Sequence, residues 1–115
     1  MVIVVGGYAS GKRTYVKSLG YEDVDMSDGV LDERPVLLNL QDLIAAASGD
    51  VQPEALAQSV ADKEVVTCCE VGNGIVPLDP GERAWREQVG RTLNILSERA
   101  DHVVRMVCGI PVTLK

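Results

Sequence analysis

The chain has 115 residues, of which 46% are hydrophobic and 24% charged, an ordinary composition for a globular protein. No apolar run approaches the roughly 20 residues that span a bilayer, so the sequence predicts no membrane span. The net charge of −6 repels a polyanion, which excludes nucleic acid from the expected partners and favours a small-molecule ligand.

Cysteine and histidine usage bears on compartment and on metal chemistry. Cys68, Cys69 and Cys108 are odd in number and lack Cys-x-x-Cys spacing, so they suit core strands in a reducing compartment. The single histidine, His102, has no ligand cluster around it and is predicted to be a structural or surface residue. Residues 2–5 are too short for the apolar core of a signal peptide, and we expect a cytoplasmic protein.

Short apolar runs alternate with helical segments along the chain. Residues 1–5, 35–40, 64–69 and 103–108 are rich in β-branched side chains and do not alternate with polar ones, a pattern typical of strands buried on both faces of a parallel sheet. Helices are predicted at 12–18, at 41–47 with a stop at Gly49, and from Pro53 to about Ala61. The acidic stretch 22–33 is predicted to be a solvated loop that contains at most one short strand, at 22–26.

The most clearly marked helix is predicted to follow Asp79, whose carboxylate can cap the first turn, with Pro80 in the first helical position. The apolar stripe of this helix indicates packing and consists of Trp85, Val89, Leu93, Leu96 and Ala100. Residues 103–108 and 112–115, joined by a Gly-Ile-Pro turn, are predicted to form a hairpin. The chain is therefore expected to be α/β, a three-layer sandwich with a mainly parallel sheet and a C-terminal antiparallel hairpin.

The first strand runs directly into Gly6-x-x-x-x-Gly11-Lys12, the start of a P-loop. Glycines allow successive backbone N–H groups to surround a phosphate, and Lys12 can reach the outer phosphates, where we expect a catalytic role. The expected nucleotide-binding residues are Gly6, Gly7, Tyr8, Ala9, Ser10, Gly11, Lys12, Arg13 and Thr14. On this basis residues 1–115 are expected to form a single P-loop nucleotide-binding domain.

Arg13 occupies the position that usually carries the magnesium-binding Ser or Thr of a P-loop. A guanidinium has no lone pair for a metal, and Thr14 is turned by about 100° from that position on a helix. We expect Arg13 to contact phosphate oxygens or a nearby acid such as Glu70, so that nucleotide binding depends only weakly on Mg²⁺. The sequence leaves the metal site itself undetermined.

A second motif, Glu70-Val71-Gly72-Asn73-Gly74-Ile75-Val76-Pro77, follows the strand predicted at 64–69. Ligands of open parallel sheets bind beyond the carboxyl ends of the strands, so this segment should face the P-loop. Glu70 is our second candidate catalytic residue, because a carboxylate there could accept a hydroxyl proton or orient a magnesium-bound water. An ordinary acid at an exposed strand end is the alternative, and both interpretations stay open.

Together these motifs resemble the adenosylcobinamide kinase/adenosylcobinamide-phosphate guanylyltransferase family. The similarity covers Gly6–Lys12 and Glu70–Pro77, and it continues through Gly90-Arg91, Leu96, Ala100-Asp101, Val103 and Gly109 to Lys115. The resemblance implies a P-loop α/β fold and ATP or GTP as cofactor. It implies transfer of the γ-phosphate to a corrinoid alcohol, then of GMP from GTP onto that phosphate, often by a homo-oligomer, a trimer.

The chain also departs from the family. It lacks the insertion that carries the guanylylated histidine, and Asn39 stands where the family's strand usually ends in a carboxylate. We therefore predict that guanylyl transfer is absent. The favoured interpretation is a shortened, divergent member that binds a nucleotide and phosphorylates a cobinamide-like alcohol. A non-catalytic nucleotide- or phosphate-binding module and a kinase for another small alcohol are the alternatives.

Overall fold

A computed structural model describes residues 1–47, 51–70 and 79–115. Its elements, in chain order, are β1 (Val2–Gly6), α1 (Lys12–Ser18), the 3-10 helix η1 (Asp23–Asp25), β2 (Met26–Asp28), β3 (Val36–Leu38), α2 (Leu40–Ala46), α3 (Pro53–Ser59), β4 (Val65–Cys69), α4 (Pro80–Arg99), β5 (His102–Val107) and β6 (Ile110–Thr113). The predicted helix stop at Gly49 and the motif residues 71–77 lie outside the described residues.

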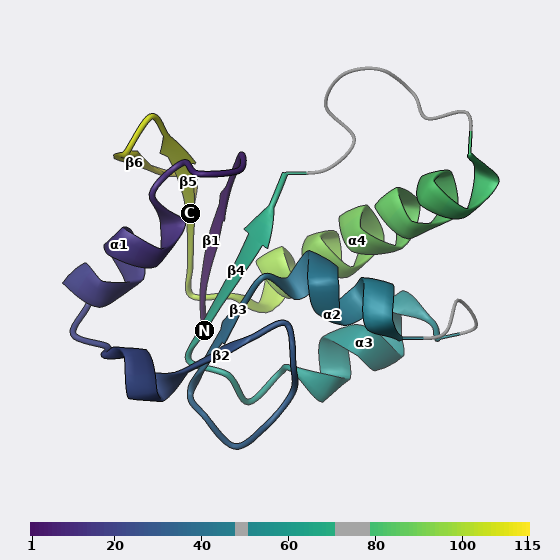
Figure 1. The fold of residues 1–115 in the computed structure, drawn as a ribbon, viewed down its shortest axis with the longest axis horizontal. Helices are drawn as coiled ribbons and strands as arrows, with labels where there is room; N and C mark the ends of the chain where they lie inside the picture. Colours follow the sequence, from purple (N-terminus) through teal and green to yellow (C-terminus); the bar gives the residue numbers. More distant parts are fainter. Residues whose placement is uncertain (48–50, 71–78) are drawn as a thin grey trace.

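Six strands form one sheet in the order β2-β3-β4-β1-β5-β6 (Figure 1). The first five are parallel and β6 is antiparallel to β5, which confirms the predicted α/β fold with its C-terminal antiparallel hairpin. β1 therefore lies between β4 and β5, and the carboxyl ends of β1, β3 and β4 meet at one edge of the sheet. That edge is where an open parallel sheet binds its ligands.

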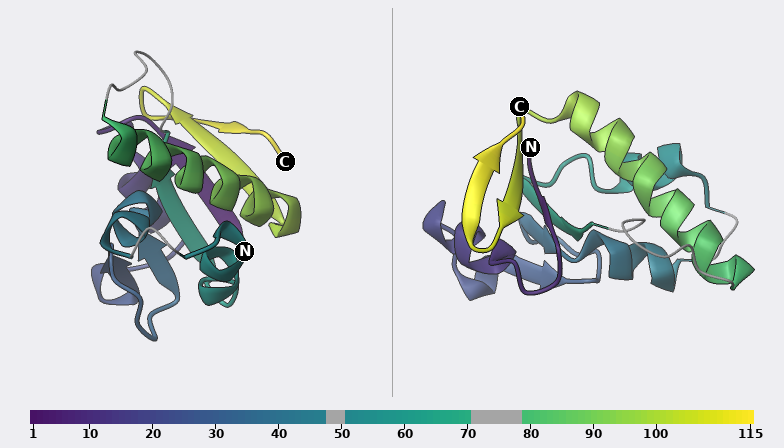
Figure 2. Two further views of the ribbon diagram at one scale, coloured as in Figure 1. Left: turned by 90° about the vertical axis from the view of Figure 1, so that its right-hand side faces the viewer. Right: turned by 90° about the horizontal axis from the view of Figure 1, so that it is seen from above.

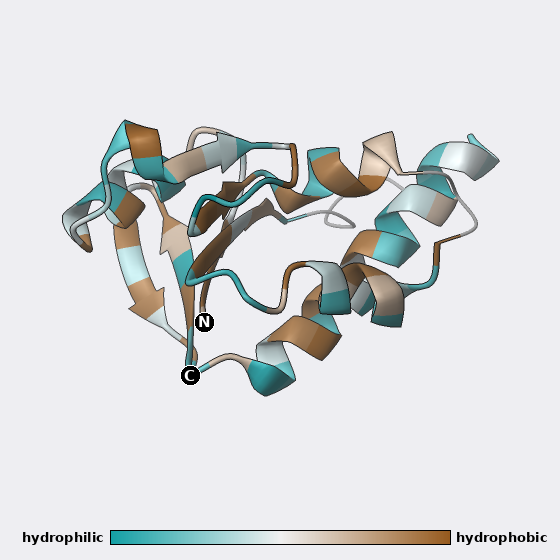
Figure 3. Ribbon diagram, turned by 90° about the horizontal axis from the view of Figure 1, so that it is seen from below, coloured by the Kyte–Doolittle hydropathy of each residue, from teal (hydrophilic) through white to brown (hydrophobic). Residues whose placement is uncertain are grey.

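Helices cover both faces of the sheet. Residues of α2, α3 and α4 pack with Ile3, Leu37 and Val66 on one face, while α1 contributes Val16 to the cluster on the other. Figure 2 shows the long helix α4 running across its face, and Figure 3 shows the hydrophobic colouring concentrated on the central strands. The fold is thus the three-layer arrangement of P-loop-like proteins.

Two local predictions are wrong. The one short strand that the acidic stretch was expected to contain, at 22–26 at most, lies instead at 26–28 as β2. Residues 23–25 form the 3-10 helix η1, because the Glu22 and Asp25 side chains cap each other's backbone and only Met26 and Ser27 are buried beside β3. The hairpin turn is formed by Cys108 and Gly109, both at positive φ, and not by Gly-Ile-Pro. Ile110 and Pro111 therefore belong to β6, an edge strand that tolerates proline.

Candidate functional site

The loop between β1 and α1 depends on glycine at two positions. A Cβ atom at Gly6 would collide with Ser10 Oγ and lie 2.9 Å from the carbonyl oxygen of Met106. Gly11 has a φ of 94°, in the left-handed region that strains other residues, and it directly precedes α1. The glycine pattern of the sequence therefore reflects both a tight approach and a required backbone conformation.

The C-terminal hairpin braces this loop. The backbone N–H of Gly109 donates to the carbonyl oxygen of Ser10 at 3.0 Å, and a Cβ atom on Gly11 would lie 3.3 Å from the Cα atom of Gly109. In Figure 1 the β5–β6 turn accordingly lies beside the segment that joins β1 to α1. Residues 99 positions apart thus hold the loop between β1 and α1 in place, which the sequence pattern did not indicate.

Lys12 is almost buried, with 8% of its surface exposed. Its ammonium group donates to the carbonyl oxygens of Gly7 at 2.7 Å and Gly6 at 3.3 Å, and it forms no ion pair with any described residue. Both acceptors are neutral, so no described residue supplies a negative charge to Lys12. Burying a cation without an anionic partner costs free energy, and an anion within reach of Lys12 would offset that cost.

A cavity of about 340 Å³ opens at the carboxyl edge of the sheet beside this lysine. Its lining consists of Tyr8, Ala9, Ser10, Gly11, Lys12, Arg13, Thr14, Asp28, Leu38, Asn39, Thr67 and Cys69. The structure thus brings residues 8–14 together around one space. Glu70 is not among the described residues that line it, and Asp28 and Thr67 are lining residues that the sequence analysis missed.

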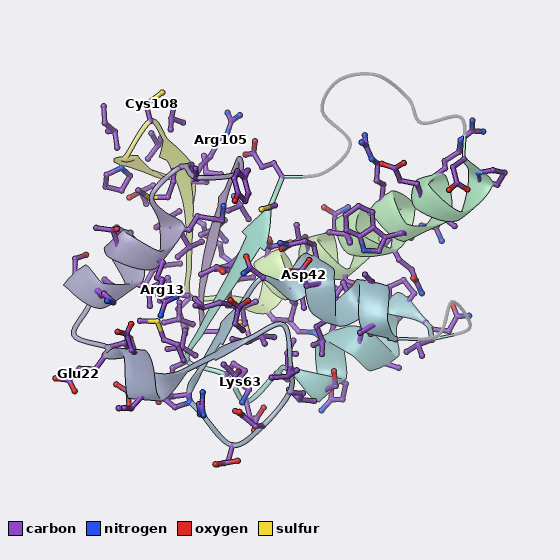
Figure 4. The ribbon with its side chains drawn as sticks, viewed as in Figure 1. Arg13, Glu22, Asp42, Lys63, Arg105 and Cys108 are labelled. Atoms are coloured by element: carbon purple, nitrogen blue, oxygen red, sulfur yellow. The ribbon has the colours of Figure 1, made fainter. Side chains whose placement is uncertain are left out.

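Arg13 contacts an acid, as expected, but the acid is Asp23 and not Glu70. Its Nη2 atom lies 2.9 Å from Asp23 Oδ1, and Lys17 Nζ lies 3.0 Å from the same oxygen. The hydrogen bond from Lys17, and then that from Arg13, lowers the pKa of Asp23. More than half of the Arg13 side chain is exposed beside α1 (Figure 4), so its charge is compensated outside the loop.

Glu70 is held by a different cation. Arg105, on β5, donates through Nε to Glu70 Oε1 at 2.6 Å and through Nη2 to Oε2 at 3.2 Å. The backbone N–H of Glu70 also donates to the carbonyl oxygen of Gly6 at 2.9 Å, which ties the end of β4 to the start of the P-loop. This bidentate pair raises the pKa of Arg105, which Figure 4 labels, and fixes the direction of the Glu70 carboxylate.

Asn39 lies at the centre of a hydrogen-bond network at the ends of β2, β3 and β4. It has a left-handed φ of 61°, its N–H donates to Thr67 Oγ1 at 3.0 Å, and its Nδ2 donates to Asp28 Oδ1 at 2.6 Å. Gln41 Nε2 donates in turn to Asn39 Oδ1 at 3.3 Å, while Gln41 Oε1 accepts from the N–H of Cys69 at 3.0 Å. These contacts hold Asp28 against the end of β3.

A mainly parallel sheet with a glycine loop and a lysine at the carboxyl end of its first strand defines a P-loop-like α/β protein. A family model described as cobinamide kinase / cobinamide phosphate guanyltransferase matches residues 37–114, and the chain belongs to this family. The match begins at β3, so the P-loop itself lies outside it. A comparison with curated proteins found no match.

In the described part of the chain, no helix has both the length and the apolar character needed to cross a membrane.

Proposed function

We propose that this chain binds a purine nucleoside triphosphate, ATP or GTP, through residues 6–14 and transfers its γ-phosphate to the hydroxyl group of a cobinamide-like alcohol. The observation that carries the proposal is the uncompensated ammonium of Lys12 beside the cavity. An oligophosphate would supply the missing negative charge. The family match supports a corrinoid as the acceptor.

Backbone donors support the same ligand. Among the described residues, the N–H groups of Lys12, Arg13 and Thr14, the first three of α1, make no hydrogen bond to another backbone group. Together with the side chain of Lys12 they can bind phosphate oxygens, and the cavity that they border also extends to the ends of β3 and β4. Phosphoryl transfer depends mainly on such positioning and charge neutralisation.

Glu70 is the proposed proton acceptor for the attacking hydroxyl. The bidentate contact with Arg105 keeps its carboxylate in one orientation, as a catalytic base requires. We expect Glu70→Gln to abolish phosphotransfer while nucleotide affinity stays within about twofold of wild type. Arg105→Met is the companion variant: it should reduce phosphotransfer less, because the carboxylate remains while its orientation is lost.

Guanylyl transfer is proposed to be absent. β5 is parallel to β1, and His102 pairs with Val2 at the amino end of the sheet, whereas the P-loop follows Gly6 at the carboxyl end. Four residues of strand separate these ends by roughly 13 Å. Incubation with labelled GTP, an acid quench and intact-mass analysis should therefore show no covalent GMP, and a GMP adduct on His102 would overturn this view.

A non-catalytic nucleotide-binding module is the second candidate. The observation that favours it is Arg13, which stands at the usual metal-ligand position and is paired with Asp23. Calorimetric titration with ATP and GTP, followed by a phosphotransfer assay with adenosylcobinamide, separates the two. Binding with turnover supports the kinase, binding without turnover supports the module, and the absence of binding refutes both.

We further propose that residues 1–115 act as one domain and assemble as a homo-oligomer, the trimer that the family resemblance implies. Exposed apolar side chains on the hairpin support an assembly surface; they are Val107, Ile110, Val112 and Leu114. Light scattering coupled to gel filtration should give three times the chain mass of 12.3 kDa. Chemical unfolding should show a single transition.

A further inference from the structure

Asp28, at the end of β2, lines the same cavity as the phosphate-binding loop. Of the described residues that line the cavity, Asp28 alone carries a carboxylate. It is the last residue of β2 and pairs in register with Leu38 of β3, and the N–H of the following Gly29 donates to the carbonyl oxygen of Leu38 at 2.8 Å. The carboxylate is therefore at the same edge as the phosphate-binding loop.

The side chain of Asp28 is positioned by Asn39. The hydrogen bond of 2.6 Å from Asn39 Nδ2 occupies Asp28 Oδ1, and Asn39 is fixed in turn by Thr67 and Gln41. The Oδ2 atom accepts no hydrogen bond from any described residue. One oxygen of the carboxylate is thus held, while the other remains available to a ligand in the cavity.

We propose that Asp28 anchors the divalent cation of the bound nucleotide and that Asn39 is its positioning residue. The inference rests on the proposed binding of a nucleoside triphosphate at residues 6–14. The residue after β3 is Asn39, which carries no charge, and the carboxylate comes instead from Asp28 at the end of the neighbouring strand β2. The side-chain amide of Asn39 orients this carboxylate through its hydrogen bond.

The donor set fits Mg²⁺. This ion prefers oxygen ligands, keeps several waters, and is commonly held by one or two carboxylates together with substrate phosphates. Asp28 supplies a carboxylate, and the nearly buried hydroxyl group of Thr67 also lines the cavity. No three His, Cys, Asp or Glu side chains in the described ranges form a metal-binding group, so the protein would hold the ion jointly with the nucleotide's phosphates.

The surrounding charges favour Asp28 over the other nearby acids. Glu70 is not among the described residues that line the cavity, and both of its carboxylate oxygens accept hydrogen bonds from Arg105. Asp42 is exposed in the first turn of α2 and does not line the cavity. The charge of Arg13 is compensated by Asp23, which weakens its repulsion of a cation. These charges favour nucleotide binding that depends on Mg²⁺. The sequence analysis expected the opposite, a weak dependence on Mg²⁺, because Arg13 stands at the usual metal-ligand position.

The test compares the affinity for ATP in Mg²⁺ and in EDTA, measured by calorimetry on the full chain. We expect wild type to bind ATP at least about tenfold more tightly in Mg²⁺ than in EDTA, because one charge-assisted contact contributes about that much to the affinity. Asp28→Asn should bring this ratio close to one without weakening binding in EDTA. Asn39→Gly should lower the ratio partly, because glycine keeps the left-handed backbone while removing the amide.

Asp42→Asn is the matched control, since it removes the same charge near the cavity but outside its lining. It should keep the wild-type ratio, and circular dichroism should show that all variants are folded. Electron paramagnetic resonance with Mn²⁺ and ATP gives a second readout: Asp28→Asn should leave more Mn²⁺ unbound by protein than Asp42→Asn does.

One result would overturn the inference alone, namely a Mg²⁺/EDTA ratio in Asp28→Asn that equals the wild-type ratio. If the affinity of Asp28→Asn for ATP also rose equally in both buffers, Asp28 would merely repel phosphate. If wild type bound ATP neither in Mg²⁺ nor in EDTA, the proposal of nucleotide binding would be refuted, and this inference with it.

Discussion

Replacing Lys12 by methionine is expected to separate ligand binding from folding. Methionine keeps most of the aliphatic stem and removes the charge. The two carbonyl groups that Lys12 contacts keep other donors, since Gly6 accepts from the N–H of Glu70 at 2.9 Å and Gly7 from the N–H of Ser10 at 3.2 Å. The free energy of unfolding should therefore fall by less than about 1 kcal/mol, or rise as an uncompensated buried charge is lost.

Lys63 is the matched control, because it is also almost buried, at 4% exposure, and also donates to two backbone carbonyl groups (Figure 4). Its acceptors, on Asp32 and Arg34, receive no other hydrogen bond from the described residues. Lys63→Met leaves two acceptors unsatisfied, and each costs about 1–3 kcal/mol, so the free energy of unfolding should fall by about 2–6 kcal/mol.

Urea unfolding at pH 7 measures both stabilities, and calorimetry with ATP measures both affinities. Lys12→Met should weaken ATP binding by about 10- to 100-fold, the equivalent of about 1.5–3 kcal/mol for a charge-assisted hydrogen bond. Under conditions in which the Lys63→Met variant is folded, it should bind ATP with wild-type affinity. Equal losses of stability in the two variants, with ATP affinity unaffected, would show that Lys12 is a structural lysine and refute the reasoning.

Three further outcomes can be measured. Burial raises the pKa of the Cys68 thiol to about 12, so a disulfide reagent at neutral pH should label exposed Cys108 in the folded protein but Cys68 only after unfolding. Asp79→Ala should lower the free energy of unfolding by about 1 kcal/mol in a urea titration, because the carboxylate of Asp79 caps α4. The pKa of Asp23 is lowered, chiefly by Lys17, so its stabilisation is present above the unfolded pKa of 3.8 and lost as pH falls through the folded value. Asp23→Asn should accordingly be less stable than wild type near neutral pH and equal to it in acid, as acid titrations of the two proteins would show.

The sequence by itself determined the features that depend on neighbouring residues. Apolar runs of β-branched side chains predicted the main strands, and Asp79 followed by Pro80 predicted the start of α4, because capping and burial patterns are local. The glycines of the loop between β1 and α1 were recognisable for the same reason, since a left-handed φ at Gly11 is a property of one residue. Short sequence motifs also predicted the family, and the family model that matches residues 37–114 confirms it.

Tertiary structure alone decided which charged groups meet. Glu70 and Arg105 are 35 positions apart, and they pair because β4 and β5 lie on either side of β1. Asp28 belongs to a stretch that resembled a solvated acidic loop, yet the parallel pairing of β2 with β3 places it in the cavity that residues 8–14 also line. Pattern and propensity act over a few residues, whereas partner choice among like carboxylates depends on strand order and register, which are settled only when the whole sheet forms.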